Sequence, residues 1–246
     1  MIMNRLSNKV AIITGGAGGL GFEDAKAFIA EGAKVAIADM AEELGKQKAA
    51  ELGPDAMFVT LNVTDEASWE AAFQQVSAQF GPVSILVNNA GIGDTPSYLK
   101  DLALPDWNKV LAVNLTGVML GVKYGMRYMA ENGGAIINIS SAIGKVGLAR
   151  AAAYSAAKAG VAELSKTAAI EAAELDLPIR VNSVHPGWVE TGIVPEEMKQ
   201  LAISKTPLKR MGLPSDVASI LVYLGSDESV FATGSEFVVD GGFLAQ

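Results

Sequence analysis

A tyrosine and a lysine stand four positions apart in the segment Tyr154-Ser155-Ala156-Ala157-Lys158. On a helix, positions i and i+4 share one face, so the lysine ammonium can lie beside the phenol oxygen. A free tyrosine ionises near pH ~10, too high for a general base at neutral pH. A cation about 4 Å away favours the phenolate by up to ~4 kcal/mol at an effective dielectric of about 20. The spacing therefore predicts a proton-transfer pair, the alternative being an ordinary surface pair.

A pair of serines upstream supplies a partner for the tyrosine. Ser140 and Ser141 follow the apolar run Ala135-Ile136-Ile137-Asn138-Ile139, which has the composition of a buried parallel strand. A hydroxyl at the carboxyl end of such a strand lies where open α/β sheets bind ligands. We expect one serine, Ser141, to serve the chemistry and the other to cap or close the loop.

A glycine-rich turn near the amino terminus predicts a cofactor site. The apolar strand Lys9-Val10-Ala11-Ile12-Ile13 leads into Thr14-Gly15-Gly16-Ala17-Gly18-Gly19-Leu20-Gly21, and a helical stretch runs on from Phe22 to Glu31. Strand, turn and helix together place backbone N–H groups against a pyrophosphate. The Gly-x-Gly-x-x-Gly match that begins at Gly16 is weak on its own, because so many glycines satisfy many patterns.

The spacing Thr14-Gly15, three residues, Gly19-Leu20-Gly21, taken with the serine, tyrosine and lysine above, resembles the short-chain dehydrogenase/reductase family. The resemblance covers essentially the whole chain. Further motifs occur in the family's order, namely Asn88-Asn89-Ala90-Gly91, Asn114, Pro186-Gly187 and Asp240-Gly241-Gly242. The closing segment from Phe231 to Gly242 is similar to bacterial secondary-alcohol dehydrogenases of this family.

Strands and helices alternate along the chain, which indicates a parallel sheet covered on both faces. Strands are expected near 9–14, 34–39, 57–62, 83–89, 135–140, 179–184 and 236–240. Helices are expected near 19–32, 41–52, 66–80, 104–131, 152–175 and 215–225, with a short one over 196–204. With the resemblance, residues 1–246 are predicted to form one Rossmann-type α/β domain, a doubly wound parallel sheet of about seven strands. Prolines and glycines interrupt 187–212, which is predicted to be a lid over the active site or an inert excursion.

Composition bounds the function. The formal net charge of −8 disfavours nucleic acid and anionic membrane surfaces as partners. The chain has no cysteine and a single histidine, which argues against disulfides and a structural zinc site, and no metal is expected. We find no long apolar span and no leader pattern, so a cytoplasmic location is expected.

Cofactor choice depends on one carboxylate. The second expected strand, Lys34 to Asp39, ends in a side chain that can accept hydrogen bonds from the ribose hydroxyls of NAD and would repel the 2′-phosphate of NADP. In the family, NADP-preferring members carry a basic residue in the glycine turn or just after this strand. Here the turn positions are glycine or alanine, and Met40 follows the strand. The sequence therefore predicts NAD as the cofactor.

The resemblance implies the remaining cofactor contacts. Asn62 and Val63 match the family's adenine-contacting pair, and the lysine of the pair above holds the nicotinamide ribose. The full set of expected cofactor-binding residues is Gly15, Gly19, Leu20, Gly21, Asp39, Met40, Asn62, Val63, Asn88, Ala90, Gly91, Tyr154, Lys158, Pro186, Gly187, Val189 and Thr191.

The expected reaction interconverts a secondary alcohol and a ketone. Tyr154 exchanges the hydroxyl proton, a hydride passes between the carbinol carbon and nicotinamide, and Ser141 orients the oxygen. By resemblance, Lys158 lowers the tyrosine pKa and Asn114 holds a water for proton exit. Asn114 could equally be a helix-interior amide that satisfies backbone groups, and both roles could coexist.

Substrate identity follows from the pocket candidates, which are mostly apolar: 93–97, 143–148, Trp188, Ile193, Val194 and Met198. No arginine is obviously placed to clamp a carboxylate, so small aliphatic, cyclic or aryl alcohols and ketones are expected. The alternatives are a hydroxysteroid dehydrogenase, a 3-oxoacyl-carrier-protein reductase, and a non-enzymatic NAD(H)-sensing or scaffold protein. By resemblance, the protein is expected to form a homotetramer.

Overall fold

The computed structural model describes residues 4–192, 194 and 196–246, and one parallel sheet runs through them. Its seven strands lie in the order β3-β2-β1-β4-β5-β6-β7. Their bounds are Val10–Thr14, Lys34–Asp39, Ala56–Thr60, Ile85–Asn88, Gly134–Ile139, Ile179–Pro186 and Glu236–Val239 for β1 to β7. The predicted seven-stranded, doubly wound sheet is confirmed, because the order reverses between β1 and β4 as in Rossmann folds.

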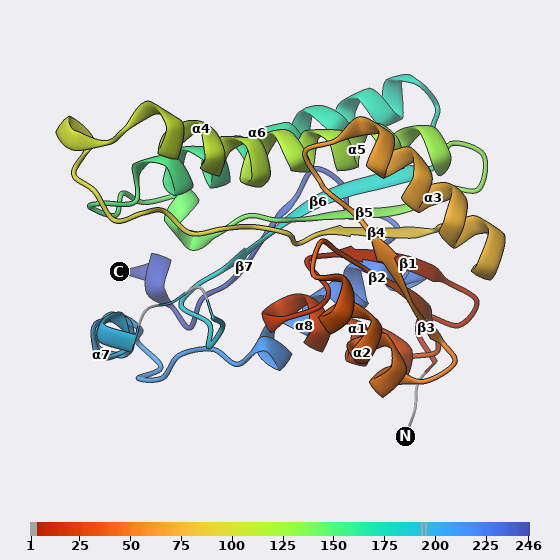
Figure 1. The fold of residues 1–246 in the computed structure, drawn as a ribbon, viewed down its shortest axis with the longest axis horizontal. Coiled ribbons are helices and arrows are strands. Elements are labelled where there is room, and N and C mark those ends of the chain that lie inside the picture. Colours follow the sequence, from red (N-terminus) through yellow and green to blue (C-terminus); the bar gives the residue numbers. More distant parts are fainter. Residues whose placement is uncertain (1–3, 193, 195) are drawn as a thin grey trace.

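Helices cover both faces of the sheet, as Figure 1 shows. One face carries α1 (Gly19–Ala30), α2 (Glu42–Leu52) and α8 (Pro214–Gly225). The other carries α3 (Glu66–Phe80), α4 (Leu104–Leu111), α5 (Gly117–Tyr128) and α6 (Ala152–Glu174). The short helix α7 (Glu196–Lys205) lies apart from both layers, on the same side of the molecule as the carboxyl terminus (Figure 1).

The helix expected over 104–131 is interrupted. The backbone makes a π-helical turn at Ala112–Thr116, between α4 and α5, and the helix ends at Tyr128. The spacing of hydrophobic residues could not predict the π-helical turn. A π-helical turn adds one residue to the helix, and over so short a stretch this leaves the hydrophobic pattern nearly unchanged. Such turns occur frequently at functional sites, and this one contains Asn114.

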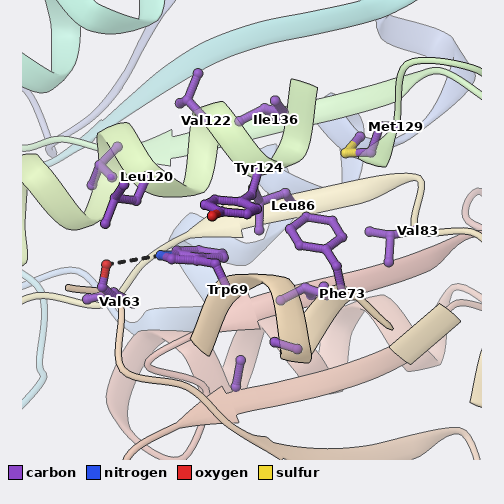
Figure 2. Close-up of a cluster of buried hydrophobic side chains, with 14 of the residues drawn as sticks. Val63, Trp69, Phe73, Val83, Leu86, Leu120, Val122, Tyr124, Met129 and Ile136 are labelled. Atoms are coloured by element: carbon purple, nitrogen blue, oxygen red, sulfur yellow. Dashed lines mark hydrogen bonds between the residues drawn. The ribbon is translucent and has the colours of Figure 1, made fainter. Parts of the chain in front are cut away.

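The sheet is held by one hydrophobic layer on each face, and aromatic rings fill the layer below α5 (Figure 2). Trp69 and Phe73 of α3 are fully buried, and the Phe73 ring stacks on Tyr128 with centroids 4.9 Å apart. The Trp69 indole N–H donates to the carbonyl of Val63 at 3.0 Å, the dashed contact in Figure 2. The core therefore anchors the corner after β3 that carries Asn62 and Val63 toward the site.

None of the described helices is long and apolar enough to cross a membrane.

Candidate active site

A cleft of about 830 Å³ opens at the carboxyl ends of the strands. This is the place where open α/β sheets bind ligands. Most of the residues predicted for the site line it: Gly15, Gly19, Leu20, Asp39, Met40, Asn62, Val63, Ala90, Gly91, Ser141, Tyr154, Lys158, Pro186, Gly187, Val189 and Thr191. Gly21, Asn88 and Asn114 do not line the cleft but lie behind its wall.

The glycine turn is built so that backbone alone faces the cleft. Gly15 has a φ of 64°, and a Cβ there would lie 2.9 Å from the Ala90 Cα. A Cβ on Gly21 would lie 2.6 Å from the Gly15 carbonyl oxygen. Helix α1 begins after Gly18 with no side-chain cap, and Gly18, Gly19 and Leu20 at its start line the cleft. These features fit the diphosphate of a dinucleotide.

Thr14 fixes the distance between this turn and the neighbouring strand. Its hydroxyl oxygen accepts from the backbone amides of Asn89 at 3.0 Å and Ala90 at 2.9 Å. The Asn89 side chain donates back to the Thr14 carbonyl at 2.9 Å. Asn88, in contrast, points into the core and donates to Asn138 at 2.8 Å. The alternation of side chains along β4 turns the Asn88 side chain into the core, and Asn89 lines the cleft.

Asp39 stands at the end of β2 and is held by two backbone amides. Its carboxylate accepts from Ala17 of the glycine turn at 3.2 Å and from Ala41 at 3.0 Å. These bonds orient the negative charge along the cleft wall beside Met40, which is 68% exposed. A charged group fixed at this position can discriminate between a ribose hydroxyl and a phosphate.

The corner Asn62-Val63 lies in the cleft, but the Asn62 side chain is engaged locally. Its oxygen accepts from the Thr64 amide at 3.1 Å and from the Thr64 hydroxyl at 2.8 Å. The expected pairing of this oxygen with an adenine amine therefore competes with an Asx-type turn.

Asn114 lies in the π-helical turn and is fully buried. Its amide oxygen accepts from the Ile92 N–H and its amide nitrogen donates to the Ile92 carbonyl, both at 2.8 Å. The side chain thus fastens the loop after β4 to the helix. Of the two roles considered for Asn114, the structural one is what its side chain performs here.

The two serines after β5 have separate surroundings. Ser140 is buried and donates to the Lys158 carbonyl at 2.7 Å, which joins the sheet to α6. Ser141 lines the cleft, accepts from the Ile143 amide at 3.2 Å, and forms a side-chain hydrogen bond with Tyr154. The Ser141 hydroxyl and the Tyr154 phenol therefore meet in the cleft.

Tyr154 and Lys158 share one face of α6, but the ammonium does not touch the phenol. Lys158 is 3% exposed, and its Nζ donates to the Ile139 carbonyl at 2.7 Å and lies 5.6 Å from the centre of the Tyr154 ring. Burial raises the pKa of Tyr154, while the Ser141 hydrogen bond lowers it and the charge of Asp94 raises it. Burial also lowers the pKa of Lys158 to about 8. The expected lowering of the tyrosine pKa by Lys158 is corrected for this structure, because desolvation of the phenol is the largest effect.

The contact between Asp94 and the start of α6 was not predicted from local sequence patterns. Both of its carboxylate oxygens lie 3.2 Å from the Tyr154 amide, so it caps the start of α6 from a distant loop. Burial raises the pKa of Asp94, and the hydrogen bond from Tyr154 opposes that rise. No local signal could have shown it, because capping motifs are recognised within a few residues of the helix start.

Arg150 is the arginine among the described residues of the cleft lining. Its guanidinium donates to the Tyr98 hydroxyl at 2.9 Å and packs 4.5 Å from that ring's centre. The rest of the substrate wall is largely apolar and includes Leu148, Trp188 and Val194. Ile193 and Pro195 of the expected lid lie outside the described residues.

No group of three or more histidine, cysteine, aspartate or glutamate side chains placed to hold a metal occurs among residues 4–192, 194 and 196–246.

The sheet order, the cleft and the glycine turn define a dinucleotide-binding α/β protein, and comparison with known proteins narrows this class. A family model described as enoyl-(acyl carrier protein) reductase matches residues 15–244. The chain belongs to the short-chain dehydrogenase/reductase family, and it is an oxidoreductase.

Two relatives indicate the range of activities around this chain. An NADP-dependent (R)-specific alcohol dehydrogenase of Lentilactobacillus kefiri is 44% identical over 99% of each chain. A 3-alpha-(or 20-beta)-hydroxysteroid dehydrogenase of Mycobacterium bovis is 46% identical over 98% of this chain and 91% of the relative. The crystal structure of a short-chain type dehydrogenase/reductase from Mycobacterium marinum superimposes with a TM-score of 0.94 at 33% identity, covering 99% of this chain and 98% of that one.

Proposed function

We propose that this chain is an NAD(H)-dependent enzyme that interconverts secondary alcohols and ketones, with Tyr154 as the general acid and base. The observation that carries the proposal is the meeting of Ser141 and Tyr154 in the same cleft as an uncapped, side-chain-free helix start. Hydroxyl groups that can hold a substrate oxygen thus share a cavity with a site suited to a dinucleotide.

In ketone reduction, a nicotinamide bound along the glycine turn would supply the hydride for the carbonyl carbon, and the residues of this chain would hold and protonate the oxygen. Ser141 donates a hydrogen bond to the carbonyl oxygen and stabilises the negative charge that develops on it. The raised pKa keeps the Tyr154 phenol protonated at neutral pH, which is the form that donates a proton to this oxygen. Lys158, with a pKa of about 8, holds a proton that it can exchange near physiological pH. Alcohol oxidation reverses each step.

Asp39 supports NAD as the cofactor. Its carboxylate is fixed by Ala17 and Ala41 on the wall that a ribose would occupy beside the glycine turn. A 2′-phosphate there would face a like charge, whereas two ribose hydroxyls could donate to it. The relative from Lentilactobacillus kefiri is named as NADP-dependent, and initial rates with NADH and with NADPH distinguish the two cofactors for this chain.

The substrate side favours an uncharged, largely apolar ketone or alcohol. Apolar side chains make up most of this wall, and Asp94 directs its two oxygens to the Tyr154 amide. A steroid is the second candidate class, because a hydroxysteroid dehydrogenase is 46% identical over nearly the whole chain. In both cases we propose that 187–212 acts as the lid, since Trp188, Val189 and Met198 line the cleft from this segment.

Assembly as a homotetramer is part of the proposal. Large apolar side chains are exposed near the end of α6 and after α8, with Ile170 61% and Phe231 fully exposed. Apolar surface of this kind commonly marks interfaces between copies. Light scattering on the purified protein is expected to give four times the mass of 25.5 kDa, and a monomeric mass would contradict this part.

Initial rates at 340 nm test the proposed function. NADH and NADPH are each supplied with acyclic, cyclic and aryl ketones, a steroidal ketone and a β-ketoacyl thioester. We expect the highest kcat/KM with NADH and a small ketone, with the steroid as the next class. Turnover confined to NADPH and the thioester would overturn the assignment, and tight NADH binding without turnover would favour a sensing protein.

A further inference from the structure

A cluster of charged side chains lies directly behind Ser141, and the proposed reaction does not use it. Its centre is Glu236, the first residue of β7, whose side chain is only 18% exposed. The carboxylate pairs with Lys145 and, at 2.7 Å, with Lys166 of α6. It also lies 3.3 Å from the Nε2 atom of His185, which is fully buried in β6.

Two of these partners lie near Ser141, one along the chain and one across the sheet. Lys145 immediately follows the 3-10 turn Ala142–Gly144, and Ser141 is the cap of that turn. The Nδ1 atom of His185 lies 3.3 Å from the Ser141 carbonyl oxygen. Glu236 therefore connects the loop after Ser141 with the strand beside it.

The charges in this cluster are well defined. The hydrogen bonds from Lys145 and Lys166 lower the pKa of Glu236 to about 2, so the carboxylate is ionised under ordinary conditions. Burial lowers the pKa of His185, although the nearby charge of Glu236 opposes the shift, and the ring is neutral at pH 7. We assign the Nδ1 proton to face the Ser141 carbonyl, which leaves Nε2 to accept from the Ser183 hydroxyl at 2.9 Å.

Burying a carboxylate costs desolvation free energy, which its ion-pair partners must offset. Glu236 comes from the last strand of the sheet, yet its carboxylate pairs with Lys145 after the turn that Ser141 caps and with Lys166 of α6. Small displacements of a group that orients the reacting atoms reduce rates strongly. The charged side chains around Glu236 are thus arranged so that they can fix the orientation of the Ser141 hydroxyl.

We propose that Glu236 is a positioning residue, which holds Ser141 in register with Tyr154 through Lys145 and the turn that Ser141 caps. The inference depends on the proposed role of Ser141 in the reaction. Glu236 itself does not line the cleft and contacts no reacting group.

A double-mutant cycle separates positioning from general support of the fold. We expect Glu236→Gln to lower kcat at least about tenfold and to leave NADH affinity within about twofold, because Glu236 does not line the cleft. In a Ser141→Ala background, the same substitution is expected to have no further effect on the residual kcat. An equal loss in both backgrounds, or full activity of Glu236→Gln, would overturn the inference.

Two further variants keep the test decisive if Glu236→Gln folds poorly. Lys145→Met breaks only the contact to the loop and is expected to lower kcat in the same direction. Glu163→Gln is the matched control, because Glu163 pairs with the same Lys166 at 2.7 Å but is exposed and outside the cleft. It should retain kcat within about twofold, and equal losses in both variants would refute the inference. Full activity of Ser141→Ala would instead refute the proposed function.

Discussion

The two ends of the cleft are built from different parts of the chain. At the glycine turn, backbone amides face the ligand, and glycines keep side chains out because a Cβ would strike neighbouring atoms. Beside β5 and α6, the groups are side chains that are buried or nearly so and already hydrogen-bonded, as with Lys158 to Ile139. At the nucleotide end, the shape of the backbone determines what can bind. At the catalytic end, the burial and protonation of side chains determine what can react.

This contrast has a consequence for substitutions. A change at the catalytic end alters a desolvated charge or proton, so rates are expected to change by orders of magnitude. A change in Asp39, a charged side chain at the nucleotide end, should redirect cofactor choice while the chemistry continues.

The largest effect is expected for Lys158→Met. Removing the buried ammonium takes away the exchangeable proton beside Tyr154 and the bond to Ile139, so kcat should fall at least about 100-fold. Steady-state rates with NADH and a ketone measure this. Lys109→Met, on the exposed side of α4, is the control and should keep the original rate. Similar losses in both variants would remove the contrast between buried and exposed lysines.

Asp39→Asn tests the nucleotide end. The amide keeps an acceptor for Ala17 or Ala41 but removes the charge, so kcat/KM for NADPH relative to NADH should rise at least about tenfold. Initial rates with each cofactor give the ratio. An unchanged ratio would mean that cofactor preference is set elsewhere in the cleft.

Asp94→Asn examines how charge at the catalytic end acts on the proton donor. Because the charge of Asp94 raises the pKa of Tyr154, its removal should lower that pKa. The rise of alcohol oxidation with pH follows the deprotonated phenol, and so it should move to lower pH in the variant. The pH profile of kcat/KM for oxidation measures this shift. A shift to higher pH would contradict the proposed influence of Asp94.

The smallest effect concerns Asp24, which lies in α1 outside the cleft lining. Both of its oxygens are buried without a hydrogen-bond partner among the described residues, and burial raises its pKa well above 3.8. When folding raises the pKa of an acid, the folded protein loses stability as pH rises toward that pKa. Above it the buried side chain carries an unfavourable charge. We therefore expect Asp24→Ala to be more stable at pH 7 by about 1 kcal/mol.

Urea unfolding of both proteins between pH 4 and 8 checks this expectation. The advantage of the variant should grow as pH rises through this range and shrink toward pH 4, where the unfolded side chain also becomes protonated. A less stable variant at pH 7 would show that Asp24 has a stabilising partner in solution.

Much of the fold could be predicted from sequence because apolar runs and turn residues are local signals. All seven strands lie near their expected positions, and of the two serines after β5, Ser140 bonds to α6 whereas Ser141 lines the cleft. The π-helical turn at Ala112–Thr116 and the capping of α6 by Asp94 could not be predicted. Both depend on segments that meet only in the folded chain.

The site residues were likewise predicted from local motifs, which do not contain contacts between distant segments. Family motifs located the glycine turn, Asp39 and Tyr154 in one cleft. They could not show that Asn88 turns into the core, nor that desolvation outweighs Lys158 in setting the pKa of Tyr154. Side-chain direction and burial come from packing, which spacing along the chain does not contain.

The proton-donor role of Tyr154 is tested most directly by a single turnover. The purified protein is loaded with NADH, its binding is measured by nicotinamide fluorescence, and loss of absorbance at 340 nm is followed after mixing with a ketone. For Tyr154→Phe, we predict NADH affinity within about twofold of the original and hydride transfer slower by about 1,000-fold. Transfer within about tenfold of the original rate would show that another group donates the proton.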